Sequence, residues 1–104
     1  MTQTALIDHI TETEFRRQVL DLARLLGYLC YFTWTSVNSP PGFPDLVMIR
    51  AGRVIFAELK SQKGKLSPRQ EEWIGGLADA GAEVYVWRPA DFETIKEILE
   101  RTLK

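Results

Sequence analysis

The sequence predicts an α/β fold in which helices flank a mixed β-sheet. Short runs rich in β-branched and aromatic residues alternate with segments of helical periodicity. Two of these runs are separated only by Arg50-Ala51-Gly52-Arg53, a segment typical of a β-hairpin turn. A helix beginning near Ser67 separates the next two predicted strands, which can therefore lie parallel. The expected element order is α-β-β-β-α-β-α.

The first helix is predicted over residues 12–26. Thr11 and Glu14 have capping-box spacing, the apolar residues that follow recur at helical intervals, and Gly27 ends the pattern. Residues 28–35 are rich in aromatic and β-branched side chains and contain no acid or base, which favours a buried strand. We expect an irregular surface loop over residues 36–44, because this segment holds three prolines and a glycine.

Residues 46–49 and 54–59 are predicted to pair as antiparallel strands. The second helix opens at Ser67, with Gln70 at the reciprocal capping position, and ends near Gly81. Residues 83–87 form the last predicted strand. Asp91 is expected to cap a final amphipathic helix whose inward-facing residues are Phe92, Ile95, Ile98 and Leu99.

Length and composition narrow the class of protein. The 104 residues are expected to form one domain, residues 1–104, and the hydrophobic (45%) and charged (26%) fractions are ordinary for a folded protein. One cysteine and one histidine exclude zinc fingers, zincins and Cys/His proteases. No apolar run spans a bilayer and the N-terminus lacks the features of a signal peptide, so a cytoplasmic protein is expected, in a bacterium or a phage-infected host cell.

The hairpin predicts a pair of opposed carboxylates. A two-residue or a four-residue loop gives the same register, with Ile49 opposite Val54, and that register puts Asp45 opposite Glu58. Lys60 shares the face of Glu58 because side chains alternate along a strand. Opposed like charges destabilise a hairpin unless a cation compensates for them or the pKa of one carboxyl group is raised. Mg²⁺ or Mn²⁺ prefers oxygen ligands of this kind and would supply the cation. Alternatively, Asp45 is a turn residue and Glu58 and Lys60 form the solvated face of an edge strand.

Three short motifs occur in order along the chain: Gly42-Phe43-Pro44-Asp45, Phe56-Ala57-Glu58-Leu59-Lys60 and Lys65-Leu66-Ser67-Pro68-Arg69-Gln70. Together they resemble the PD-(D/E)xK nuclease superfamily, and specifically its VRR-NUC branch in the stand-alone form found in phages and bacteria. The resemblance covers almost the whole chain and implies a restriction-endonuclease-like sheet.

The resemblance also implies roles for individual residues. Asp45 and Glu58 would be metal ligands, the backbone carbonyl of Leu59 a third ligand, and Lys60 the catalytic lysine. Glu14 and Gln70 would be neighbours of the active site, Glu14 as an outer-shell metal ligand and Gln70 as a catalytic residue that orients Lys60 or touches a phosphate. Both residues also suit a purely structural role as helix caps.

The segment after Lys60 is locally basic, although the whole chain has a formal net charge of −1. Lys63, Lys65 and Arg69 are therefore candidate DNA-binding residues beside the expected metal site. The alternative is an ordinary solvated loop.

The leading hypothesis is a Mg²⁺- or Mn²⁺-dependent endonuclease that hydrolyses DNA and needs no organic cofactor. Cleavage of branched DNA, such as Holliday junctions or flaps formed in repair and recombination, is favoured over sequence-specific restriction because the chain is too short for a separate recognition domain. The resemblance to junction resolvases implies a homodimer. The second hypothesis is a non-catalytic DNA-binding or assembly subunit that retains the nuclease fold.

Overall fold

The computed structural model describes residues 3–33 and 38–101. Its four strands form a single sheet in the order β1-β2-β3-β4. The elements along the chain are α1 (Gln3–Asp8), α2 (Glu12–Leu25), β1 (Leu29–Phe32), β2 (Leu46–Arg50), β3 (Arg53–Leu59), α3 (Pro68–Asp79), β4 (Glu83–Trp87), the short 3-10 helix η1 (Pro89–Asp91) and α4 (Phe92–Glu100).

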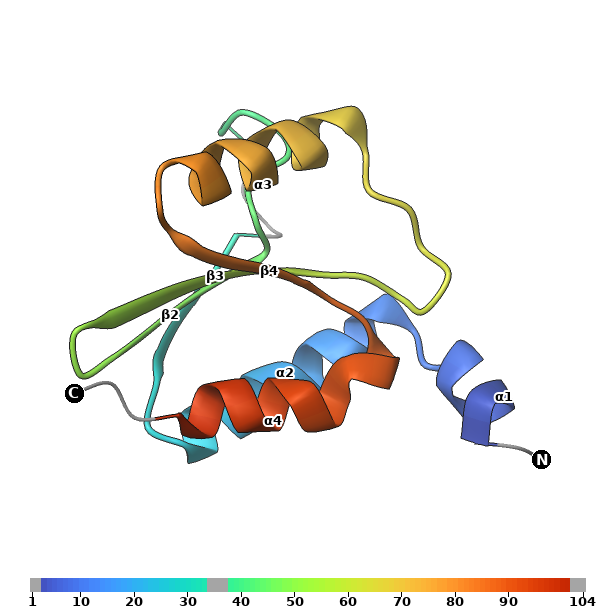
Figure 1. The fold of residues 1–104 in the computed structure, drawn as a ribbon. Helices are drawn as coiled ribbons and strands as arrows, with labels where there is room; N and C mark the ends of the chain where they lie inside the picture. Colours follow the sequence, from blue (N-terminus) through green and yellow to red (C-terminus); the bar gives the residue numbers. More distant parts are fainter. Residues whose placement is uncertain (1–2, 34–37, 102–104) are drawn as a thin grey trace.

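The sheet is mixed, because β1, β2 and β3 pair antiparallel and β4 runs parallel to β3. Helix α3 lies on one face, whereas α2 and α4 lie side by side on the other (Figure 1). The predicted α/β fold, restriction-endonuclease-like with a mixed sheet between helices, is therefore confirmed.

The β2–β3 hairpin has the predicted register, with Ile49 opposite Val54 and Leu46 opposite Ala57. Its loop contains only Ala51 and Gly52, which both have positive φ angles, of 50° and 81°. Positive φ at both central residues is the requirement of a type I′ turn, whose twist matches that of the flanking strands. The turn therefore fixes the register, and the register brings the two motif carboxylates to the same end of the hairpin.

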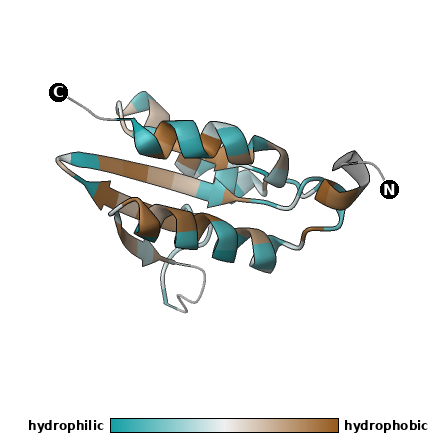
Figure 2. Ribbon diagram, turned by 90° about the horizontal axis from the view of Figure 1, so that it is seen from below, coloured by the Kyte–Doolittle hydropathy of each residue, from teal (hydrophilic) through white to brown (hydrophobic). Residues whose placement is uncertain are grey.

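The core lies between the sheet and the α2–α4 pair. Residues on one side of β2 and β3 pack against the buried apolar residues of both helices. Hydrophobic and hydrophilic residues alternate along the helices in Figure 2, as expected for amphipathic helices. Fully buried side chains of this core include Phe15, Val19, Leu46, Met48, Ile55, Leu59, Ile95 and Leu99. The strand that carries Glu58 is thereby anchored along its length.

A strand forms within residues 28–35 as predicted, at Leu29–Phe32, but the prediction that this strand is buried is wrong. β1 is an edge strand that pairs only with β2, and Leu29 and Tyr31 are 75% and 67% exposed. Hydrophobic composition alone does not distinguish a central strand from an edge strand with one uncovered face. Positions 34 and 35 of the predicted strand, and positions 36 and 37 of the predicted loop, lie outside the described residues.

Two further details differ from expectation. The helix α1 was not predicted. Asp91 precedes α4, but its side chain does not cap that helix; instead it accepts a hydrogen bond from the backbone N–H of Arg88 at 2.8 Å. In the chain from residue 3 to 33 and from 38 to 101, none of the helices is long and apolar enough to cross a membrane.

Candidate active site

Asp45 immediately precedes β2 and is almost fully buried, with 6% of its surface exposed. Its Oδ2 atom accepts a hydrogen bond from the backbone N–H of Leu59 at 3.0 Å. The Oδ1 atom lies 3.3 Å from Nη2 of Arg16 on α2. The carboxylate is therefore held at the end of the hairpin from two sides, by the neighbouring strand and by a helix.

Glu58, in β3, is 1% exposed and follows Ala57, the partner of Leu46, so that the register continued by one step puts it opposite Asp45. Burial, followed by the nearby charge of Asp45, raises the pKa of Glu58 to about 8. Lys60 lowers this pKa but does not offset the two larger effects. A cation bound beside this carboxyl group would therefore stabilise its ionised form.

Lys60 follows β3 directly, and its backbone N–H donates to the carbonyl oxygen of Trp87 at 3.0 Å, which fixes the start of the next segment. Its side chain is 15% exposed, and its ammonium lies 3.9 Å from Oε1 of Glu12 on α2. Glu12 also bonds Arg16 at 2.8 Å. Lys60 at the end of the hairpin therefore lies near Glu12 and Arg16 in the first turns of α2.

The Gln70 side chain forms two hydrogen bonds, one that caps α3 and one to a carboxylate of the candidate site. Its Oε1 atom accepts from the backbone N–H of Ser67 at 2.8 Å, which completes the predicted capping box of α3. Its Nε2 atom donates to Oε2 of Glu58 at 3.0 Å. One amide side chain therefore joins the start of α3 to the candidate metal ligand, and its contact in the site is with Glu58.

Glu14 is exposed on α2, where its backbone N–H donates to Oγ1 of Thr11 at 3.1 Å. The carboxylate that α2 contributes to the site belongs to Glu12 instead. Residues two positions apart in a helix point about 200° away from one another, so Glu12 and Glu14 cannot share a face.

Sequence reasoning missed Glu12 and assigned no individual role to Arg16. Both residues belong to the helical stripe that also contains the buried Phe15 and Val19. Two charged residues at i, i+4 spacing on an otherwise apolar stripe were the available signal, because a charge on the inward face needs a partner there.

The predicted DNA-binding residues all lie on exposed surface, but their charges are partnered differently. The Lys63 ammonium lies 3.3 Å from Oδ2 of Asp8, and Arg69 lies 2.9 Å from Oε1 of Glu72. Lys65 is exposed and forms no ion pair with a described carboxylate. Contact with DNA stays a prediction for all three.

The donor atoms suit a hard divalent cation. Oε1 of Glu58 is buried, and no donor from the described residues forms a hydrogen bond with it. An orphaned buried carboxylate oxygen is costly, and a cation would remove that cost. The described residues hold no group of three or more His, Cys, Asp or Glu side chains around one point. Two carboxylates and the Leu59 carbonyl, completed by water and phosphate, match the usual Mg²⁺ environment.

A cleft of about 660 Å³ opens beside Asp45. Its walls come from β1, the loop before Asp45 and the start of α3, and they include the aromatic residues Tyr31, Phe43 and Trp73. The Phe43 ring packs edge-on against Trp73, with centroids 5.1 Å apart, and against Phe56 at 5.9 Å. Phe43 therefore closes the α3 side of the sheet and also lines the cleft.

Comparison with known families agrees with this arrangement. The family model of the VRR-NUC domain matches residues 30–91, which is more than half of the chain and includes Asp45, Glu58, Lys60 and Gln70. The chain belongs to the VRR-NUC domain family. This VRR-NUC domain is accordingly a nuclease-type domain. No curated protein and no solved structure matches the sequence of the chain.

Proposed function

We propose that this VRR-NUC protein is a Mg²⁺- or Mn²⁺-dependent endonuclease that hydrolyses phosphodiester bonds of DNA, with a preference for branched substrates such as junctions or flaps. The strongest support is the pair of buried carboxylates, Asp45 and Glu58, which lie beside Lys60 at the end of one hairpin. The orphaned Oε1 of Glu58 adds to it, because a purely structural buried acid would be expected to have its hydrogen bonds completed.

Asp45, Glu58 and the Leu59 carbonyl would hold the metal ion. When bound, the ion would activate a water molecule and polarise the scissile phosphate. Arg16 and the Leu59 N–H fix the orientation of Asp45, and Gln70 fixes that of Glu58. Lys60 supplies an ammonium that can donate to a phosphate oxygen and stabilise the charge that develops during hydrolysis.

The preference for branched DNA is supported by the cleft beside Asp45. Its three aromatic side chains offer stacking surfaces for an unpaired base, and such stacking is largely independent of sequence. Unpaired or easily displaced nucleotides occur at junctions and flaps, whereas a regular duplex offers none without the cost of unstacking.

We also propose that the protein acts as a homodimer. Leu29, Ile49 and Val54 are opposed across three neighbouring strands and are 75%, 45% and 42% exposed, so they form an apolar row at the turn end of the hairpin. A second copy of the chain would cover this row, and a two-fold dimer would present two sites to two strands. Light scattering that shows a strict monomer, with and without DNA, would contradict the dimer.

The enzymatic proposal is tested with labelled four-way, flapped, single-stranded and linear duplex DNA in Mg²⁺ or Mn²⁺. Wild type should cut branched DNA fastest, and Asp45→Asn and Lys60→Gln should lower the rate by about 10²–10³-fold or more. Lys96→Gln, an exposed substitution on α4, is the matched control and should cut as wild type does. Circular dichroism confirms that each variant is folded.

The non-catalytic alternative gives a different result in the same experiment. A DNA-binding or assembly subunit would bind the substrates but leave all of them intact with either metal. Equal cleavage by wild type and by the folded Asp45→Asn variant would also refute the proposed site, because it would mean that the hydrolysis arises elsewhere or from a contaminant.

A further inference from the structure

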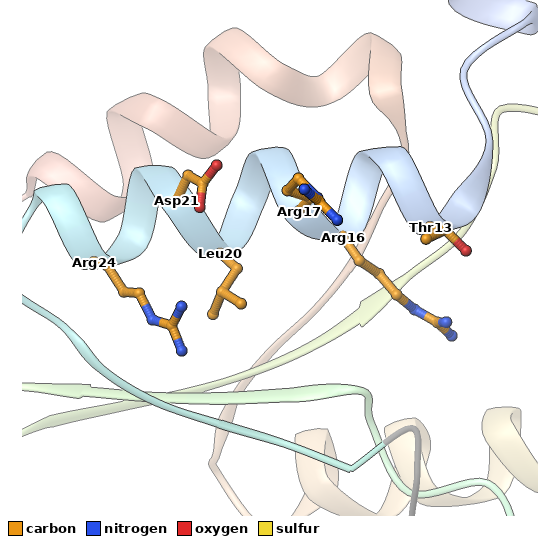
Figure 3. A pocket seen from close by; sticks show the side chains of 6 residues that line it. All are labelled: Thr13, Arg16, Arg17, Leu20, Asp21 and Arg24. Carbon is orange, nitrogen blue, oxygen red and sulfur yellow. The ribbon is translucent and has the colours of Figure 1, made fainter.

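A second groove, of about 580 Å³, follows α2 away from the candidate active site (Figure 3). Side chains from three turns of the helix line it, and in Figure 3 those of Arg16, Leu20 and Arg24 project on the side of the strands. The lining residues are Thr13, Arg16, Arg17, Leu20, Asp21 and Arg24. Three of the six are arginines, against a single carboxylate.

Most arginines of the protein have structural partners. Arg53 is buried and bound to Glu83, while Arg50 donates to the carbonyl oxygens of Leu26 and Arg101. Other partnered arginines are Arg16 with Asp45, Arg69 with Glu72 and Arg88 with the Gly64 carbonyl.

Arg17 and Arg24 differ from these. Both are exposed, and within residues 3–33 and 38–101 neither guanidinium has a carboxylate at ion-pair distance, although Asp21 lies between them on the helix. Two guanidinium groups that share one groove without a direct ion pair, against the single carboxylate of Asp21, favour an anionic ligand.

The groove adjoins the candidate active site. Arg16 lines both the groove and the cleft beside Asp45, and its Nη2 atom lies 3.3 Å from the Asp45 carboxylate. Arg24 lies seven positions after Arg17 in the α-helix, a rise of roughly 10 Å. This length is close to the axial rise of three nucleotides in one strand of B-form DNA. A strand that leaves the site along α2 would therefore carry phosphates past both arginines.

We infer that the α2 groove holds the sugar–phosphate backbone of the DNA strand on one side of the scissile phosphate, and that Arg17 and Arg24 contact its phosphates. The inference rests on the proposed nuclease function for the identity of the ligand. The Asp21 carboxylate would repel the same phosphates. The proposed binding therefore depends on the attraction of two guanidinium groups exceeding the repulsion of one carboxylate.

The test measures binding separately from cleavage. Fluorescence anisotropy with a labelled four-way junction in Ca²⁺ or EDTA compares wild type, Arg17→Gln/Arg24→Gln, Asp21→Asn and the control Lys96→Gln. The double variant should raise Kd about 10-fold or more at low salt. It should also lower the slope of log K against log salt by about 1.4–1.8, the contribution of two phosphate contacts. Asp21→Asn should lower Kd, and Lys96→Gln should leave it unchanged.

The outcomes separate this inference from the proposed activity. The inference that the groove binds DNA is overturned if the folded double variant has the Kd and salt slope of the wild type. It is also overturned if the wild type binds no DNA. If the double variant binds weakly and Asp21→Asn binds tightly while wild type cuts nothing, the groove is supported and the nuclease function fails. If wild type cuts and the double variant binds and cuts equally well, the nuclease function stands and the groove fails.

Discussion

The two ends of β3 each bury a charged residue, but they complete its hydrogen bonding differently. At the start, Arg53 donates through Nε and Nη2 to both carboxylate oxygens of Glu83, and through Nη1 to Tyr28 Oη and the Ile98 carbonyl. Near the end of the strand, Glu58 has one bonded oxygen and one orphaned oxygen. The first arrangement is closed and stabilises the fold, whereas the second remains open to a ligand.

The largest expected effect is a loss of stability when the hydrogen-bond network of Arg53 is broken. Arg53→Met should lower the free energy of unfolding by about 3 kcal/mol, because removal of one partner leaves the other groups of a buried network unsatisfied. Glu58→Gln should instead leave the stability of the metal-free protein equal or higher, since it replaces a buried carboxyl group that ionises at a cost by a neutral amide of similar shape. Urea denaturation in EDTA measures both variants, and equal destabilisation by the two would contradict the contrast.

The second expected effect is a pH dependence that originates at the open end. The folded-state pKa of Glu58 is raised to about 8 from an ordinary value of 4.5, so the folded protein binds more protons than the unfolded chain between these values. Stability should therefore be greatest below pH 4.5 as far as this group is concerned, and should fall as pH rises towards 8. Between pH 6 and 7.5 the loss is at most about 2 kcal/mol.

Denaturation of the metal-free protein at these two pH values measures this loss. The variant Glu58→Gln should lack it, which makes it the matched control. A wild-type stability that is flat or rises over the same interval would contradict the assignment of a raised pKa to Glu58.

A third effect is expected from the metal. Mg²⁺ at ten times its dissociation constant should stabilise the wild type by about 1.4 kcal/mol, because a ligand of the folded state shifts the folding equilibrium. Glu58→Gln should lose most of this response. Thermal melts with Mg²⁺ and with EDTA measure it, and a Tm that is indifferent to Mg²⁺ and Mn²⁺ in wild type would argue against a metal site.

The smallest effects come from two glycines near the helix that supports Glu58. A Cβ atom on Gly42, whose φ is 100°, would lie 2.6 Å from the backbone of Arg69, next to Gln70. Gly42→Ala should therefore destabilise the protein by about 1–2 kcal/mol and disturb the Gln70 contact. Gly75→Ala meets nothing within 4 Å in the middle of α3 and should stabilise it by about 0.5–1 kcal/mol. Chemical denaturation measures whether each variant is less or more stable than the wild type. Equal stability changes in the two variants would refute the close approach of Gly42 to the backbone of Arg69.

The parts predictable from sequence were those governed by local rules. The hairpin register followed from the short segment between two apolar runs, because a two-residue and a four-residue loop give the same pairing, and it located Asp45 and Glu58 together. The cap at Ser67 followed from a motif of four residues. What could not be predicted depends on packing between distant elements. The exposure of β1 depends on which strands α3 covers, and the choice of Glu12 over Glu14 depends on how α2 is rotated against the sheet.

The double role of Gln70 gives the site a spectroscopic reporter. The amide that accepts from the Ser67 N–H also donates to Glu58, so the first turn of α3 and the carboxylate share one rotatable group. Protonation of Glu58, or a ligand at its oxygens, changes what that group can donate to and therefore how firmly it holds the helix end. The Ser67 amide proton, exposed on the surface, should consequently register events at a buried acid through its NMR chemical shift and its exchange rate with solvent.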